Sequence, residues 1–162
     1  MVHIRLFFIS LLFLLGSSSC AAEILTGKVV KVADGDTFTL LVDGRTQYRI
    51  RLHGIDAPEI KGGQPFSRVA RQALADMVAG QLVAVEVRDT DRYGRYIGVV
   101  TTAEVADVNL AMLQAGLAWH YSRYDNTPSY RQAEKAARSR RLGLWTDKSP
   151  INPQSWRKGV RH

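Results

Sequence analysis

The chain has 162 residues, 46% of them hydrophobic, which is enough for one domain with a buried core and argues against intrinsic disorder. The formal net charge of +7 favours a polyanionic partner, although many basic proteins do not bind nucleic acid. Cys20 is the only cysteine, so an intramolecular disulfide is excluded and packing must stabilise the fold.

The first 22 residues have the pattern of a signal peptide. His3 and Arg5 precede an apolar run, and small residues suited to cleavage follow it. The run is shorter than the roughly 20 apolar residues that span a bilayer, so we do not expect a membrane span. We predict a leader over residues 1–22 and a secreted or periplasmic protein. Cleavage before Cys20 would instead give a lipid-anchored protein, which we rank second.

Residues 24–53 alternate between apolar and polar side chains, as strands covered on one face do. Asp34-Gly35 and Asp43-Gly44 divide this region into three strands, and both dipeptides are typical of antiparallel hairpins. The first half of the domain is therefore predicted to be a β-meander.

The second half of the chain mixes helical and strand patterns. Apolar residues at helical spacing predict three helices, at residues 66–78, 108–115 and 129–141. Alternating residues at 81–88 and 93–101 add two strands, which brings the total to five. We expect the helices to cover a barrel. The basic segment over residues 147–162 contains two prolines, and we expect it to be irregular.

Three short motifs carry residues suited to phosphodiester chemistry. They are Asp34-Gly35-Asp36-Thr37, Arg51 with Ile55-Asp56-Ala57-Pro58-Glu59, and Asp91-Arg92-Tyr93-Gly94-Arg95. The carboxylates of Asp36 and Asp56 are hard oxygen donors that suit calcium, whereas scattered histidines and one cysteine serve zinc poorly. The first motif alone would indicate only an ordinary turn, because acidic residues beside glycine are common there.

The second motif needs an irregular backbone to work. Arg51 and Asp56 would point to opposite faces of a regular strand, and Gly54 between them is a natural site for a bend. Pro58 ends the strand and fixes Glu59 in a loop beside the carboxylates. Arg51 and Arg95 each present a planar fork that matches phosphate oxygens.

Two further segments, Gln114-Ala115-Gly116-Leu117-Ala118 and Gly143-Leu144-Trp145, complete a set of motifs that resembles the thermonuclease (staphylococcal nuclease) family from about Leu25 to Trp145. The resemblance implies a five-stranded OB-fold barrel with three helices over residues 23–146, in the α+β or all-β class. It also implies a calcium-dependent endonuclease that cleaves DNA and RNA to give 3′-phosphate ends. We expect a monomer that prefers single strands.

The resemblance implies roles by position. Asp36, Asp56 and the main-chain carbonyl of Ala57 would hold calcium, and Glu59 would be the general base or orient the attacking water. Ala57 replaces the threonine of the best-known member, which a ligand acting through its backbone oxygen should tolerate. The lysine-rich loop of the family is mostly absent between Glu59 and the first helix.

Arginines and tyrosines have the remaining implied roles. Arg51 and Arg95 would clamp phosphate, and Arg92 and Tyr93 match part of the pocket for the terminal nucleotide. Tyr121 and Tyr124 could complete that pocket or could simply pack on the third helix. His53 and His120 have no metal-binding spacing, so we interpret them as structural or surface residues.

Two alternatives compete with a nuclease. An OB barrel can bind single strands by charge and stacking without cutting them. The same arginines could also serve an exported phosphatase that acts on small phosphate esters. Digestion of a polynucleotide separates both alternatives from the nuclease.

Overall fold

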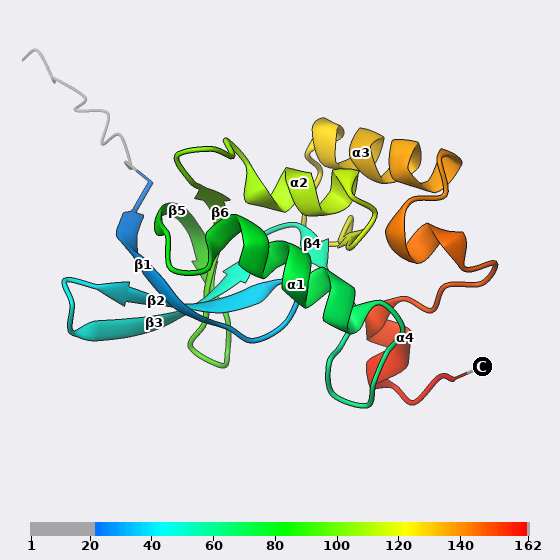
Figure 1. Cartoon of the computed structure of the whole chain (residues 1–162), viewed down its shortest axis with the longest axis horizontal. Coiled ribbons are helices and arrows are strands. Elements are labelled where there is room, and N and C mark those ends of the chain that lie inside the picture. The colour runs from blue at the N-terminus through cyan, green and yellow to red at the C-terminus, as the bar shows by residue number, and fades with distance from the viewer. Residues whose placement is uncertain (1–21, 162) are drawn as a thin grey trace, which may run out of the picture.

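The computed structural model describes residues 22–161 (Figure 1). Apart from Ala22, the predicted leader lies outside these residues, as does Cys20, so both predictions stay as they are. Within the described part of the chain, no helix is both long and apolar enough to cross a membrane.

Five strands form a closed barrel in the order β1-β2-β3-β6-β5. They are β1 (Ile24–Val32), β2 (Thr37–Val42), β3 (Thr46–Leu52), β5 (Leu82–Thr90) and β6 (Tyr96–Thr101). The β3–β6 pair is parallel and the other pairs are antiparallel. The predicted five-stranded barrel is confirmed. Asp43 and Gly44 both have positive φ angles, of 52° and 66°, which is the backbone that a tight hairpin turn requires.

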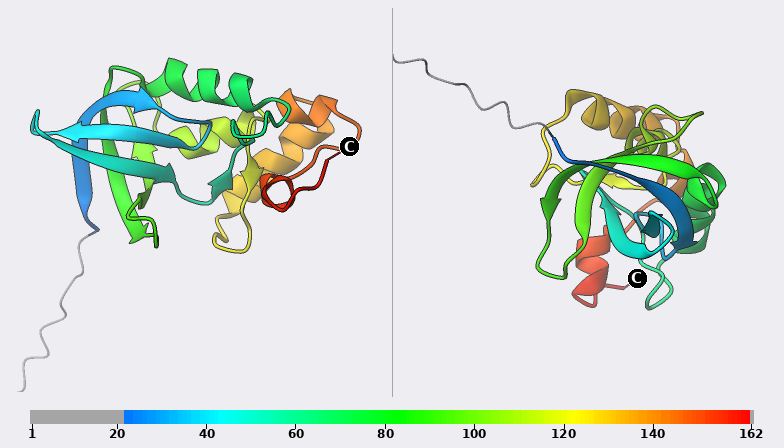
Figure 2. Two further views of the ribbon diagram at one scale, coloured as in Figure 1. Left: turned by 90° about the horizontal axis from the view of Figure 1, so that it is seen from below. Right: turned by 90° about the vertical axis from the view of Figure 1, so that its left-hand side faces the viewer.

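The three predicted helices are also present. They are α1 (Ser67–Val78), α2 (Val108–Gln114) and α3 (Pro128–Ser139), and a 3₁₀ turn, η1 (Gly143–Thr146), follows them. Figure 2 shows the barrel at one end of the molecule and α3 and α4 at the other. Two short strands, β4 (Ile55–Asp56) and β7 (Trp119–His120), pair with each other outside the barrel.

The segment after η1 corrects one expectation. Residues 147–162 were expected to be irregular, but Pro153–Arg157 form a short helix, α4. The Asn152 side chain accepts a hydrogen bond from the Ser155 N–H, and Pro153 stands at the first helical position, where its missing N–H costs nothing. Helix α4 packs beside the loop that joins β4 to α1 (Figure 1).

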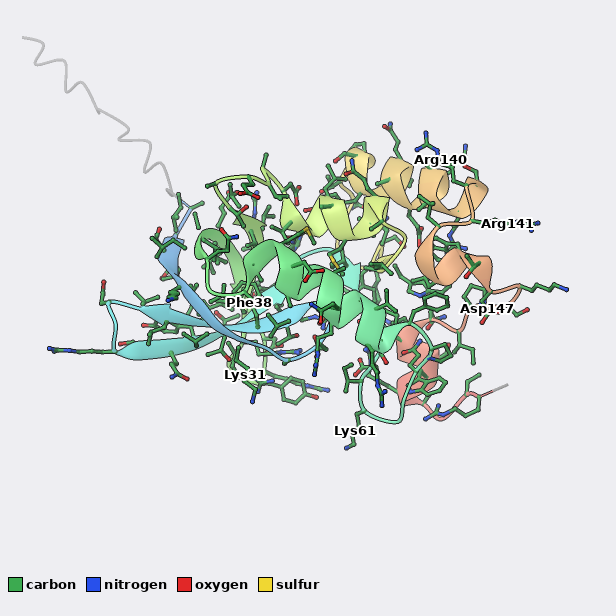
Figure 3. The ribbon with its side chains drawn as sticks, viewed as in Figure 1. Lys31, Phe38, Lys61, Arg140, Arg141 and Asp147 are labelled. Atoms are coloured by element: carbon green, nitrogen blue, oxygen red, sulfur yellow. The ribbon has the colours of Figure 1, made fainter. Side chains whose placement is uncertain are left out.

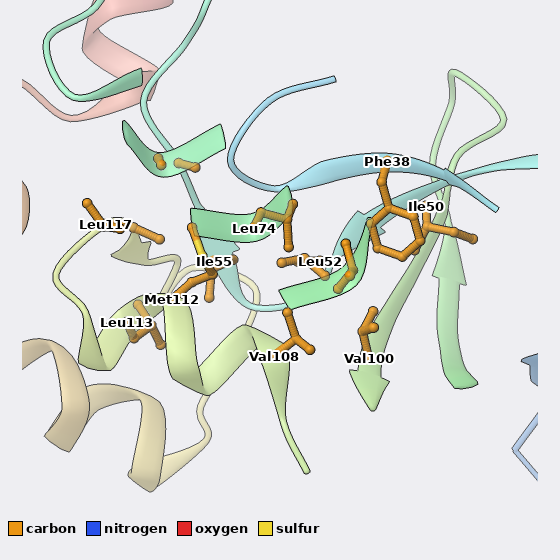
Figure 4. Close-up of a cluster of buried hydrophobic side chains, with 14 of the residues drawn as sticks. Phe38, Ile50, Leu52, Ile55, Leu74, Val100, Val108, Met112, Leu113 and Leu117 are labelled. Carbon is orange, nitrogen blue, oxygen red and sulfur yellow. The ribbon is translucent and has the colours of Figure 1, made fainter. Parts of the chain in front are cut away.

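The core joins the inside of the barrel to α1 and α2 (Figure 4). Phe38 and Ile50 fill the barrel, Leu74 enters from α1, and Met112 and Leu113 enter from α2, all of them fully buried. Burying each such side chain contributes about 1.5–3 kcal/mol. This packing fixes the strand ends that carry the candidate site.

Candidate active site

One guanidinium bridges two buried carboxylates beside the barrel. Nη1 of Arg51 donates to Oδ1 of Asp36 at 2.9 Å, and Nη2 donates to Oδ1 of Asp56 at 2.8 Å. Asp36 and Asp56 are each only 3% exposed. We call these three residues the carboxylate centre. Sequence separation does not prevent their meeting, because Thr37, next to Asp36, pairs with Arg51 across the β2–β3 ladder.

The backbone between Arg51 and Asp56 bends where the sequence predicts. Gly54 has a φ of +71°, a conformation that glycine adopts without strain. A Cβ at this position would lie 2.9 Å from Cγ of Asp125, so the bend is also closely packed. The chain therefore reverses after β3 and places Asp56 on the same side as Arg51.

The charges of the carboxylate centre stabilise one another. Burial alone would raise the pKa of Asp36, but the Arg51 guanidinium and the hydrogen bond from the Ala57 N–H hold it below its usual value. Burial would lower the pKa of Arg51, and the two carboxylates raise it instead. Burial and the neighbouring Asp36 carboxylate raise the pKa of Asp34 to about 7.

The donor set suits a hard divalent cation. Oδ2 of Asp36 accepts the Ala57 N–H at 3.0 Å, which brings the Ala57 main chain against the carboxylate. Among residues 22–161, no three His, Cys, Asp or Glu side chains gather closely enough to form a metal site of their own. Asp36 and Asp56 would therefore need main-chain and water oxygens to complete a coordination shell, and these are the ligands that calcium accepts.

Glu59 lies in the loop between β4 and α1, and the end of the chain fixes this loop. The Glu59 N–H donates to Oε1 of the buried Gln64 at 2.8 Å, and Nε2 of Gln64 donates to the carbonyl of Ile151 at 2.8 Å. The indole N–H of Trp156 donates to the carbonyl of Lys61 at 3.3 Å. Figure 3 shows Lys61 at the tip of this loop, beside α4.

The structure adds Arg157, which the sequence did not indicate. Its Nη2 donates to Oδ2 of Asp56 at 2.8 Å, its Nη1 donates to Oδ1 of Asp56 at 3.2 Å, and Nη1 also pairs with Oε1 of Glu59. Burial would lower the pKa of Arg157, but the hydrogen bond and charge of Asp56 raise it. The only signal in the sequence was the general basic character of the segment.

Arg95 belongs to a second, separate cluster. Its Nε donates to Oδ2 of Asp91 at 2.7 Å, and its guanidinium lies 5.7 Å from the ring centre of Tyr93. Arg92 contacts the same ring and donates to its hydroxyl at 2.7 Å. None of the contacts that Arg95 makes among the described residues reaches the carboxylate centre. Its two terminal nitrogens therefore stay available to a ligand.

Tyr121 and Tyr124 pack against each other with ring centres 4.8 Å apart. Burial and the Asp56 carboxylate raise the pKa of Tyr121, so this phenol lies within electrostatic reach of the carboxylate centre. Tyr124 is exposed. The exposed Tyr124 ring thus packs on Tyr121 and presents a face to solvent.

His53 and His120 both contact the carboxylate of Asp125. Nε2 of His53 lies 3.3 Å from Oδ1 of Asp125, and Nε2 of His120 lies 2.8 Å from Oδ2. Burial would raise the pKa of Asp125, but hydrogen bonds from Thr127 and His120 hold it below its usual value. These contacts support the bend at Gly54 and agree with a structural interpretation of both histidines.

Comparison with known proteins identifies the family. The profile described as "Staphylococcal nuclease homologue" matches residues 49–147. An uncharacterized endonuclease of Haemophilus influenzae is 39% identical over 141 residues, which cover 87% of this chain and 78% of that protein. A micrococcal nuclease of Shigella flexneri is 42% identical, with 84% and 82% covered, and a probable staphylococcal-like nuclease of rice is 45% identical, with 72% and 34% covered. The chain belongs to the staphylococcal nuclease family.

Proposed function

We propose that the protein is a calcium-dependent endonuclease that hydrolyses phosphodiester bonds of DNA and RNA. The observation that carries the proposal is the carboxylate centre, in which Arg51 joins Asp36 to Asp56 and the loop with Glu59 follows directly. Relatives named micrococcal nuclease and endonuclease support the same activity. Family membership and the hard oxygen donors together support calcium as the metal.

Asp36, Asp56 and the Ala57 carbonyl would hold the metal. Calcium bound there would place positive charge against a phosphate oxygen and so stabilise the charge that develops during attack. Arg51 has five N–H donors, and its contacts with the two carboxylates leave others to face the same phosphate. The carboxylates thus orient the Arg51 fork before the substrate arrives.

Glu59 would take a proton from the attacking water or orient that water. Its side chain is 25% exposed, so water reaches it, while Gln64 holds its backbone in place. Arg95 would supply the second phosphate clamp through the terminal nitrogens that its pair with Asp91 leaves available. The bond to the 5′-oxygen of the next nucleotide would break, which gives the 3′-phosphate end.

The charge and the exposed side chains support a polyanionic substrate. A net charge of +7 and exposed arginines and tyrosines suit a flexible polyanion, and we propose single strands as the preferred form. The leader pattern supports export to the periplasm or the medium, and lipidation at Cys20 is the second option. We propose a monomer.

Digestion of denatured DNA and of RNA, with calcium and then with a chelator, tests the proposal. We expect fragments only with calcium, and we expect their ends to resist polymerase extension until a phosphatase removes the 3′-phosphate. DNA that shifts on a gel but keeps its length would show a binding protein instead. Release of phosphate from a nucleoside monophosphate, without cleavage of the polynucleotide, would show a phosphatase.

A further inference from the structure

Residues 150–161, which we call the C-terminal segment, lie beyond the residues that match the family profile. They are nonetheless fixed against the active-site loop. Ile151 accepts the hydrogen bond from Gln64, Trp156 is 8% exposed and donates to Lys61, and Arg161 stacks on the Trp156 ring at 3.7 Å. This packing delivers Arg157, at the end of α4, to the carboxylates.

The contacts of Arg157 fall on two groups with proposed roles. Both oxygens of Asp56 accept hydrogen bonds from the Arg157 guanidinium, and the same guanidinium pairs with Glu59. A divalent cation bound to Asp56 would approach the Arg157 guanidinium, and like charges repel. Arg51 bonds only Oδ1 of Asp56, whereas Arg157 bonds both oxygens. Arg157 therefore competes with a metal ion for Asp56 more directly than Arg51 does.

We propose that Arg157 is a latch: its guanidinium holds Asp56 and Glu59 while no metal is bound, and it leaves them when calcium binds. The C-terminal segment thereby raises the calcium concentration at which the site fills. The inference rests on the proposed function, because it takes Asp56 as a calcium ligand. The positive charge of Arg157 would thus neutralise Asp56 and Glu59 until calcium is abundant.

The geometry lets the latch open without unfolding. The Arg157 side chain is 40% exposed, whereas Trp156 beside it anchors α4 in the loop. Rotation of one long side chain into solvent therefore releases Asp56 and leaves the helix in place. When the closed form is removed, a ligand that binds only the open form gains affinity by a factor equal to the reciprocal of the open fraction.

Calcium titration by calorimetry tests the latch on wild type, Arg157→Ala, Arg157→Gln, Arg157→Lys and Lys158→Ala. We expect Arg157→Ala and Arg157→Gln to lower the calcium Kd by about tenfold if nine molecules in ten are latched. Arg157→Lys should fall between these variants and wild type, because lysine keeps the charge and loses the bidentate contact. Lys158→Ala removes an exposed charge on the next residue and should change the Kd far less.

Two results of this titration would overturn the latch alone. Equal tightening by Lys158→Ala would reduce the effect to net charge, and weaker binding by Arg157→Ala and Arg157→Gln would make Arg157 a positioning residue for Asp56. Either result removes the latch and leaves the proposed function intact. Wild-type protein that binds no calcium at millimolar concentration would overturn the metal assignment and the latch together.

Nuclear magnetic resonance gives a readout that does not depend on activity. The side-chain Nε–H signal of Arg157, assigned from its loss in Arg157→Lys, should move toward the position of a solvated arginine as calcium is added. The Arg95 signal serves as the control, because its pair with Asp91 does not involve Asp56. An Arg157 signal that does not move while calcium binds would also overturn the latch.

Discussion

The carboxylate centre and the C-terminal segment meet at Asp56, but they are held in different ways. Arg51 lies on β3 of the closed barrel, and Asp36 directly precedes β2, where its carbonyl accepts the Leu52 N–H at 2.8 Å, so strand hydrogen bonds fix both residues. Arg157 reaches the Asp56 carboxylate from a five-residue helix near the end of the chain. The barrel therefore provides a rigid frame, and the chain end provides a contact that can be released at low cost.

Substitution of Glu59, which pairs with Arg157, has the largest expected effect on activity. Glu59→Gln keeps the size of the side chain and an oxygen that accepts from Arg157, but it removes the basic carboxylate. We expect kcat on denatured DNA to fall by about 10²- to 10⁴-fold. Folding should change little, because Glu59 is partly exposed and its backbone contact with Gln64 is unaltered.

Glu104→Gln is the matched control, because Glu104 is exposed in the loop between β6 and α2. This variant should keep wild-type kcat and thermal stability. An undiminished kcat in Glu59→Gln would contradict the proposed role of Glu59 and would leave the proposed mechanism without a general base.

Arg51→Ala tests whether charge, as well as the barrel, holds the carboxylate centre in place. It leaves Asp36 buried without its guanidinium partner, and breaking a buried pair in this way costs about 3–5 kcal/mol. Urea unfolding in the presence of a chelator should show this loss, and calcium should restore part of it by replacing the missing positive charge.

Arg88→Ala is the surface counterpart for Arg51→Ala. Arg88 pairs with Glu86 at 3.0 Å, but both side chains are well exposed, so the loss should be about 0–1 kcal/mol. Equal losses in the two variants would contradict a buried, charge-supported centre.

Gly54→Ala disturbs the bend that brings Arg51 and Asp56 together. A left-handed conformation costs an alanine about 1–2 kcal/mol, and its Cβ would also lie 2.9 Å from Asp125. We expect a total of about 2–4 kcal/mol in chemical unfolding, since overpacking adds to the backbone cost. Gly44→Ala has a similar φ with no atom within 4 Å, so it should show the backbone cost alone.

The barrel and the carboxylate centre could be predicted from the sequence because each of their parts depends on residues close together in the chain. Alternation predicts the strands, a glycine between Arg51 and Asp56 predicts the bend, and a hairpin places Asp36 beside Arg51. The family motifs then named the same residues. The roles of these residues in catalysis stay predictions, since geometry alone does not test them.

The contact from Arg157 could not be predicted, because it depends on how a distant segment docks. A five-residue helix is too short to show a helical period, and no pattern in the chain links it to Asp56. The pair Asn152 and Pro153 could have predicted the helix start, since a capping side chain followed by proline is typical there. This capping pattern would not have predicted that Arg157 contacts Asp56.

Trp156→Ala should have the smallest effect on global stability. Trp156 anchors α4 against the loop, and we expect α4 to undock while the barrel stays folded, so the loss should not exceed the docking free energy of the segment. We expect a change below about 1 kcal/mol in urea unfolding, together with much faster amide exchange over residues 153–160. Trp145→Ala is the control, because Trp145 is buried with Ala137 and Leu144 and truncation of a core tryptophan costs about 3–5 kcal/mol. A similar global loss in both variants would mean that the C-terminal segment unfolds only with the barrel, and the contrast between a rigid frame and a releasable chain end would fail.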